Sequence, residues 1–258
     1  MENALLLGLS RQIALDRELE VVANNIANIG TTGYKADGSV FEEFLSPTAL
    51  NGQFPAAHRR LSLVHDRATW HDFRSGPILQ TGNPLDVAIN GDAFFVVQTP
   101  RGERYTRNGA FQLDADGRLV TSEGYAVQGD GGSIQFQVND SKIVISDDGT
   151  IRVREGADPK SDAQRGKLRL VRFDQVARLK KDGASLFTAP NGLTPQAPLA
   201  TQKVRVVQGA LEQSNVRGVA EMSRMIEITR TYTHIAGLLQ QHGDMRRNAI
   251  DKLAEVPA

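Results

Sequence analysis

The residues of this sequence that could bind a metal or transfer protons are three histidines and their acidic neighbours. His58, His65 and His71 fall within 14 residues, and Asp66 and Asp72 stand beside two of them. Imidazole and carboxylate groups are common ligands of zinc and iron in proteins. Their spacing here matches no common ligand signature, and the segment is rich in charge. We therefore expect solvated histidines, no metal site and no cofactor.

Other motifs of catalytic or binding sites are incomplete. Asp114, Asp116 and Gly117 resemble the start of a calcium loop, but a strand pattern resumes at Leu119, which favours a hairpin turn. The glycine cluster at 129–132 lacks the third glycine of a dinucleotide fingerprint. No Gly-x-Ser-x-Gly elbow is present, and no Ser-His-acid triad suggests itself. A hydrolase remains an alternative, supported only by the three histidines and scattered carboxylates.

Composition excludes several classes of protein. The chain has 258 residues, and its 30 Lys and Arg balance 30 Asp and Glu, which argues against nonspecific nucleic-acid binding. Because there is no cysteine, there is no disulfide framework and no thiol nucleophile. The first apolar run, Ala4–Leu9, is short, and no Lys or Arg precedes Arg11, so we predict no cleaved signal peptide. No stretch approaches about 20 apolar residues, which predicts no membrane insertion.

Both ends of the chain have the spacing of amphipathic helices. At the first end, apolar residues follow steps of 4, 3, 4 and 3: Leu15, Leu19, Val22, Ile26 and Ile29. At the other end, between 216 and 254, the same kind of stripe contains Met225, Ile228, Tyr232, Ile235 and Leu239. An isolated helix of this kind is marginally stable in water. We therefore expect the two helices to pair into a coiled-coil-like bundle that neighbouring copies complete.

The middle of the chain reads as short strands separated by turns. Six Asn-Gly or Asp-Gly pairs stand between β-rich runs and would supply the positive φ of tight turns; their glycines are Gly91, Gly109, Gly117, Gly149, Gly183 and Gly192. The fold class predicted is α+β, with long terminal helices and a central, mainly antiparallel β domain. The boundaries expected are a terminal helical assembly domain of residues 1–35 and 211–258, an extended connector of 36–80, and a β domain of 81–210.

Four blocks of sequence resemble the flagellar basal-body rod and hook proteins. They are VVANNIANIGTTGYK at 21–35, TGNPLDVAINGDAFFVV at 81–97, YTRNGAF at 105–111 with Gly124-Tyr125, and GALEQSNV at 209–216 with Glu221-Met222 and Met225-Ile226. The sequence departs from the family pattern at Gly30, where a polar residue is commoner, and at Thr233, where an acid is expected. The start MENAL, with Ala36-Asp37 and the FEE at 41–43, looks most like the proximal-rod branch; the distal-rod branch is the alternative.

The resemblance implies a structural subunit and not an enzyme. Such proteins leave the cell unfolded through the flagellar type III export apparatus, without a cleaved signal. They polymerise with copies of themselves and with other rod subunits into the rod of the basal body, which crosses the periplasm and transmits torque. The terminal helices pack with those of neighbours, and the β domain lies outside. No nucleic-acid partner is implied.

Two groups of residues follow as site hypotheses. The ten stripe residues given above, from Leu15 to Ile29 and from Met225 to Leu239, would form the subunit interface. A second group would fix the end of the first helix and the turn after it: Asn24, Asn25, Asn28, Gly30, Thr31, Gly33 and Tyr34. A glycan-binding β module is a further alternative, and it would use exposed aromatic residues such as Trp70, Tyr105 or Tyr125.

Overall fold

The structure is a computed structural model, and it describes most of the chain in two compact units. The described residues are 2–46, 61–155, 162–183, 185–198 and 204–254. The first unit, called here the helical unit, consists of Met1–Ala27, Asp37–His71 and Arg217–Ala258. The second, the β unit, consists of Asn28–Ala36 and Asp72–Val216.

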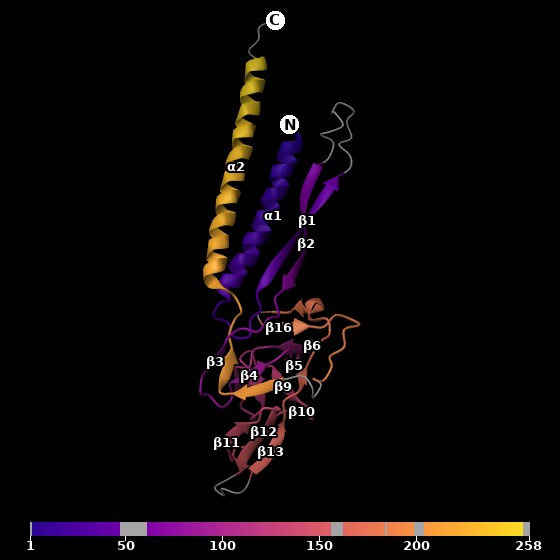
Figure 1. The fold of residues 1–258 in the computed structure, drawn as a ribbon, viewed down its shortest axis with the longest axis vertical. Helices are drawn as coiled ribbons and strands as arrows, with labels where there is room; N and C mark the ends of the chain where they lie inside the picture. Colours follow the sequence, from indigo (N-terminus) through magenta and orange to yellow (C-terminus); the bar gives the residue numbers. More distant parts are fainter. Residues whose placement is uncertain (1, 47–60, 156–161, 184, 199–203, 255–258) are drawn as a thin grey trace. The chain divides into compact units, whose positions relative to one another are not determined.

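The described part of the helical unit contains two long helices and two paired strands. Helix α1 (Glu2–Ala27) lies between α2 (Gly218–Ala254) and the strands β1 (Asp37–Ser46) and β2 (Leu61–His71), as Figure 1 shows. The strands pair antiparallel, from Asp37 opposite His71 to Ser46 opposite Leu61. The sequence predicted an extended connector over 36–80. In the described part of that range, β1 and β2 contact α1 and belong with it to the helical unit, whereas Asp72 and the residues after it belong to the β unit. The connector and the domain boundaries given from the sequence stay predictions.

The β unit is a set of short antiparallel strands. Its largest sheet runs in the order β15-β16-β6-β5-β9-β8-β7, with β14 beside β5 and β10 beside β9. These strands are β5 (Phe94–Thr99), β6 (Gly102–Thr106), β7 (Phe111–Leu113), β8 (Leu119–Thr121), β9 (Ala126–Gly129), β10 (Gly132–Ser133), β14 (Leu170–Val171), β15 (Lys180–Lys181) and β16 (Leu186–Thr188).

Three smaller sheets and one short helix complete the described part of this unit. They contain β11 (Asp140–Ile145), β12 (Thr150–Glu155) and β13 (Asp162–Lys167) in one sheet, β17 (Arg205–Gln208) with β4 (Val87–Asn90), β18 (Ala210–Glu212) with β3 (Ile78–Gln80), and the 3₁₀ helix η2 (Val176–Arg178). Every strand pairing found among the described residues is antiparallel. The α+β fold class with a mainly antiparallel β domain is thus confirmed.

Strand β5 lies at the centre of the core because both of its faces are covered. Phe95 and Val97 belong to one cluster of buried apolar residues, whereas Phe94 and Val96 belong to a second cluster. Successive side chains of a strand point to opposite faces, so four consecutive buried residues require a layer on each side. The β unit therefore has a closed core of its own.

Five of the six predicted turn glycines have the expected conformation. Gly91, Gly117, Gly149, Gly183 and Gly192 all have positive φ. The sixth does not, and the prediction was wrong there: Gly109 allows a close approach, because a Cβ at this position would lie 1.7 Å from the Val87 carbonyl oxygen.

Candidate assembly interface

Helices α1 and α2 meet through seven of the ten predicted stripe residues. Leu15, Val22 and Ile228 are buried between them, and Leu19, Ile26, Met225 and Ile235 pack against these three with half-buried side chains. We call these seven the seam. An ion pair of Arg224 and Glu18, at 2.7 Å, lies beside it. The two helices of one chain thus cover each other along the seam; a coiled-coil geometry stays a prediction.

The other three predicted stripe residues lie outside the seam. Tyr232 is exposed and Leu239 is half buried on α2. Ile29 is exposed and belongs to the β unit, two residues after the last residue of α1.

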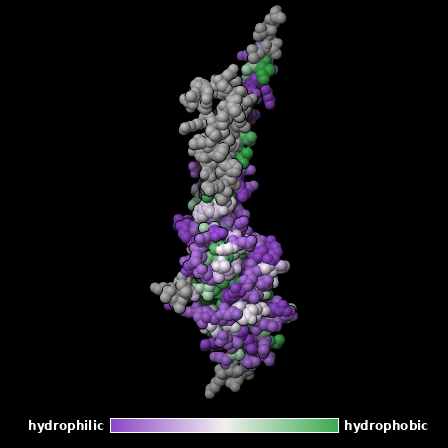
Figure 2. All heavy atoms as spheres, turned by 90° about the vertical axis from the view of Figure 1, so that its right-hand side faces the viewer, coloured by the Kyte–Doolittle hydropathy of each residue, from purple (hydrophilic) through white to green (hydrophobic). Residues whose placement is uncertain are grey.

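A second line of apolar residues on α2 faces away from the seam. Val219, Met222 and Ile226 are 84%, 53% and 54% exposed, and their spacing of 3 and 4 places them on one side of the helix. We call these three the outer stripe. On α1, Leu9 and Ile13 are likewise exposed. Figure 2 shows green patches on the helical unit, whereas the surface of the β unit is mostly purple. These apolar side chains are therefore not buried within the single chain and remain in contact with water.

Asn25 fastens the end of α1 to two other elements of the helical unit. Its side-chain amide donates to the Asp37 carbonyl oxygen at 2.8 Å and to Glu221 Oε2 at 3.3 Å, and its Oδ1 accepts from the Asp37 N–H at 2.8 Å. The residue is buried. It therefore ties the last turn of α1 to the start of β1 and to the first turn of α2, while Asn24 lies on the exposed side of the same turn.

The turn after α1 is built into the β unit. Thr31 Oγ1 donates to Asn28 Oδ1 at 3.1 Å. Tyr34 is buried, and the Lys181 ammonium group lies 3.7 Å from the centre of its ring, a cation–π contact. Gly33 has φ +67°, and a Cβ there would lie 2.4 Å from the Asn108 backbone nitrogen. The family motif thus closes part of the β unit's core.

Gly30 has a different status from Gly33. Its φ is outside the left-handed region, and a Cβ added to it would meet no atom within 4 Å. The backbone therefore does not require glycine at this position, which agrees with the polar residue expected there from the family resemblance.

A buried ionic cluster joins three of the four family blocks. Lys35 Nζ donates to Glu212 Oε1 at 2.6 Å and to the Arg74 carbonyl oxygen at 2.8 Å. Arg107 Nη1 donates to Glu212 Oε2 at 3.4 Å, and the Gly76 N–H donates to Glu212 Oε1 at 2.9 Å. The side chains of the three charged residues are at most 2% exposed. A single carboxylate thus holds two cations that are 72 residues apart in the chain.

Two effects act in opposite directions on the pKa of Lys35: its burial and its attraction to Glu212. Burial lowers the pKa of Lys35 below its usual value, and the attraction of Glu212 acts in the opposite direction. Burial likewise lowers the pKa of Arg107. Sequence reasoning missed these residues. The available signal was one charged residue in each of three blocks: Lys35, Arg107 and Glu212.

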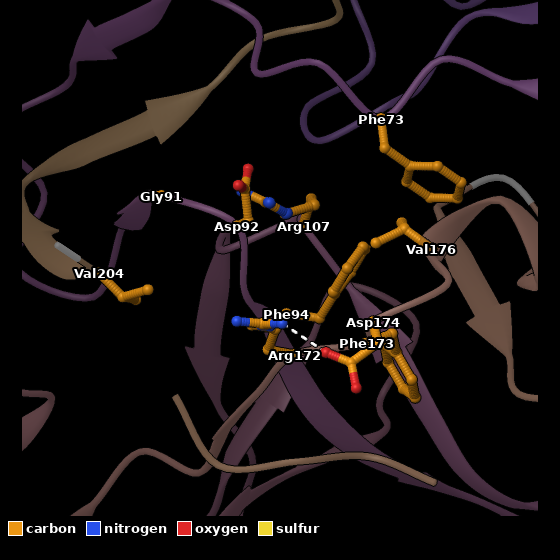
Figure 3. Close-up of a pocket in the computed structure, with 10 residues that line it drawn as sticks. All are labelled: Phe73, Gly91, Asp92, Phe94, Arg107, Arg172, Phe173, Asp174, Val176 and Val204. Carbon is orange, nitrogen blue, oxygen red and sulfur yellow. Dashed lines mark hydrogen bonds and ion pairs between the residues drawn. The ribbon is translucent and has the colours of Figure 1, made fainter. Parts of the chain in front are cut away.

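A cavity of about 560 Å³ in the β unit borders this cluster (Figure 3). Arg107 lines it, with its guanidinium 4.9 Å from the centre of the Phe94 ring. Arg172 forms an ion pair with Asp174 on the same wall. Both cationic side chains on the wall thus have an anionic partner within the unit, although Arg107 Nε is buried without a hydrogen-bond partner among the described residues.

The structure describes only some of the residues considered for metal or glycan binding. His58 lies outside the described residues, as does the side chain of His65, whereas His71 Nδ1 is 2.7 Å from Asp37 Oδ1. No three His, Asp or Glu residues within the described ranges cluster as metal ligands. Tyr105 is buried, with its ring against Phe173 at 4.8 Å, so it cannot stack on a glycan.

The helical unit thus exposes apolar surface outside its helix pair, and the β unit has a closed core of its own. Comparison with known families identifies the class of protein. Residues 5–35 match the family described as flagella basal body rod protein, 88–153 match the D1 domain of the flagellar hook protein FlgE/F/G family, and 207–252 match the C-terminal region of the flagellar basal body rod FlgEFG proteins.

Similar proteins extend the match over the full chain. The flagellar basal-body rod protein FlgF of Caulobacter vibrioides is 38% identical over 99% of this chain and 100% of its own length. FlgF of Mesorhizobium japonicum is 33% identical over 98% of both chains. The rod protein FlgG of Agrobacterium fabrum is 34% identical over 89% of this chain and 91% of its own.

The chain therefore belongs to the flagellar basal-body rod protein family, structural proteins of the basal body that are not enzymes. Within that family it is most like the FlgF proteins, which it matches over nearly its entire length. Neither α1 nor α2, as far as they are described, has an apolar stretch that could cross a lipid bilayer.

Proposed function

We propose that this rod subunit assembles through the outside of its helix pair. The observation that carries the proposal is the outer stripe: Val219, Met222 and Ile226 expose their side chains although α2 is already paired with α1. Leu9 and Ile13 add apolar surface on α1. Burying such side chains against neighbouring subunits supplies about 25 cal/mol per Å² of apolar surface removed from water.

The seam has a supporting role in the same interface. Leu15, Val22 and Ile228 hold the two helices together and so fix the position of the outer stripe. The predicted interface residues that keep exposed area, Tyr232 and Leu239 on α2 and Ile29 after α1, gain burial when neighbouring subunits arrive. Asn25 maintains the end of α1 from which this surface starts. Gly33 and Tyr34 hold the turn after it within the β unit.

In the cell, the subunit takes its place in the proximal part of the rod, which crosses the periplasm and transmits torque. Similarity to FlgF over 98–99% of the chain supports the proximal position. Identity of 30–34% to several FlgG proteins supports the distal rod as the second candidate. Export through the flagellar type III apparatus is compatible with a chain that contains no cysteine and hence no disulfide to prevent unfolding.

Motility of cells that carry a stripe variant tests the assembly surface. In the double variant Val219→Asp and Ile226→Asp, two charges would have to be buried between subunits. We therefore expect rod assembly to stop at the position of this subunit and the cells not to swim. His234→Asp, an exposed position on the same helix, is the matched control and should leave motility intact. Normal swimming of the double variant would refute the proposal.

A further inference from the structure

A groove opens between the helices near the start of α1 and the end of α2. Leu7, Gly8 and Arg11 of α1 form one wall, and residues of α2 form the other: Ile235, Leu238, Leu239, Gln241, His242 and Met245. Its volume is about 450 Å³, and its lining is mostly apolar. Gly8 lies so close to Leu239 that a Cβ would be 2.6 Å from the leucine Cδ2. The groove continues the seam, because Ile235 belongs to both.

The end of α2 extends past the first helix. The pairs Glu18 with Arg224 and Gly8 with Leu239 show that the helices run antiparallel. By this register Glu2 lies opposite about residue 245, so the last described residues of α2, about 246–254, have no described stretch of α1 opposite them. At 1.5 Å per residue they form about 14 Å of helix. Ile250 is exposed there. The helix pair is thus unequal at its two ends.

The groove is also incomplete in its hydrogen bonds. His242 lines it, and the Nδ1 atom of this side chain is enclosed without a hydrogen-bond partner in the described chain. Arg11 and Gln241 supply further donors at the groove. The outer stripe, in contrast, is flanked by Ser223 and Thr229, whose hydroxyl groups donate to backbone carbonyls of their own helix and keep oxygen lone pairs for a donor.

We propose that the groove of one chain receives the outer stripe of a second copy of the same chain. The proposal rests on the assembly role given above and names the two surfaces that meet. The outer stripe lies at the start of α2 and the groove near its end, so one chain offers two different patches. A contact between unlike patches leaves one of each free and adds further copies without closing, whereas contact between like patches ends at a dimer. An open polymer is what a rod requires.

Cysteine pairs test this contact, because the chain has no cysteine of its own. Met222→Cys and Leu238→Cys place one thiol in the stripe and one in the wall of the groove, at positions 53% and 51% exposed. After oxidation of purified chains, we expect a disulfide dimer when the two single variants are mixed, at least tenfold more than from either alone. A chain with both cysteines should give a ladder of multimers. Met222→Cys mixed with His234→Cys is the control and should give little dimer.

Three outcomes decide the proposal. Equal dimer from Met222→Cys alone would show contact between like patches and would overturn it. No dimer from the mixture would overturn it as well, and wild-type motility of both cysteine strains would show that the variants fold and that the proposed function stands. A photoreactive residue at position 238 can also be crosslinked in isolated basal bodies. A crosslink to a different rod protein would show that this protein, and not a second copy of the same chain, occupies the groove, and would overturn the proposal.

Discussion

The two units of this molecule differ in how completely they bury their apolar side chains. In the β unit, β5 has neighbouring layers on both faces, and four consecutive residues, Phe94 to Val97, are at most 1% exposed. In the helical unit, the cluster between α1 and α2 has three buried members among the residues whose side chains are described. Several apolar residues of its helices remain in water.

This difference separates a part that is complete in one chain from a part that, under the proposed function, neighbouring subunits complete. The β unit even encloses charged groups, and it pairs them: Lys35 and Arg107 share Glu212. The helical unit leaves surface for contacts that a single chain does not make. Mutations should therefore lower stability most in the β unit and impair assembly most in the helical unit.

The largest effect is expected from Glu212→Gln. The change keeps the shape of the side chain but leaves the Lys35 and Arg107 cations buried without a countercharge, which costs about 3–5 kcal/mol of unfolding free energy. Hydrogen exchange of β5 amides would measure the loss in the β unit, and fluorescence of Trp70, the single tryptophan, would report on the helical unit. Glu103→Gln, which breaks a surface pair with Arg169, should cost about 0–1 kcal/mol. Equal losses would contradict the difference between the two pairs.

A smaller loss is expected from Gly33→Ala. The added Cβ meets the backbone of Arg107 and Asn108 at 2.4–2.5 Å, and φ is +67°, so strain and overpacking together cost about 2–4 kcal/mol. Gly30→Ala, three residues earlier, meets nothing and should be neutral or raise the unfolding free energy by up to about 1 kcal/mol. Urea denaturation of the pair measures both. Similar values would mean that the turn is not held by the β unit.

Asp140→Asn tests an ion pair of the β unit whose carboxylate is 2% exposed and whose Arg165 partner is 15% exposed. Hydrogen bonds from Arg165, at 2.6 and 2.7 Å, are the main cause that lowers the pKa of Asp140 below 3.8. The stability from this carboxylate is therefore full above pH 3.8 and is lost as the pH falls through the lowered pKa. The variant should lose about 1.5–3 kcal/mol at pH 7. It should also show a shallower fall on acidification, measured by urea denaturation from pH 7 to 2. An unchanged acid profile would contradict the role of this pair.

The sequence predicted what depends on local spacing. Steps of 3 and 4 residues identified the seam from Leu15 to Ile26 and from Met225 to Ile235, and paired Asn-Gly or Asp-Gly residues identified five turns. The same spacing cannot say which side of a helix is buried. Val219, Met222 and Ile226 follow the helical period as well, and only the partner of α2 shows that they face water.

The rest depends on contacts between distant residues. Lys35 and Glu212 are separated by 177 positions, and no local pattern marks either as buried. The strands at 37–46 and 61–71 were hidden for a similar reason, since they pack on α1, which precedes them in the chain. The three residues of the ionic cluster lie in the sequence blocks shared with the family. The blocks do not show which of their residues are in contact in the folded chain.

The smallest effect on stability is expected from Ile226→Ala, and the matched change is Ile228→Ala. The two isoleucines lie two positions apart on α2, yet Ile226 is 54% exposed and Ile228 is 4% exposed. Removing the buried side chain leaves a cavity in the seam and costs about 2–5 kcal/mol. Removing the exposed one should change the unfolding free energy by less than about 0.5 kcal/mol, because alanine is also the better helix former. Trp70 fluorescence during urea denaturation measures both.

Assembly should rank the same two variants differently from stability. Ile226→Ala keeps a stable helical unit but removes one third of the outer stripe, so rods should form less completely although the monomer is intact. Counting flagella per cell, at equal amounts of exported protein, separates this loss from instability. If Ile226→Ala cells carried the normal number while the purified variant was destabilised, the side chain would serve the monomer, and the helical unit would be as complete in one chain as the β unit.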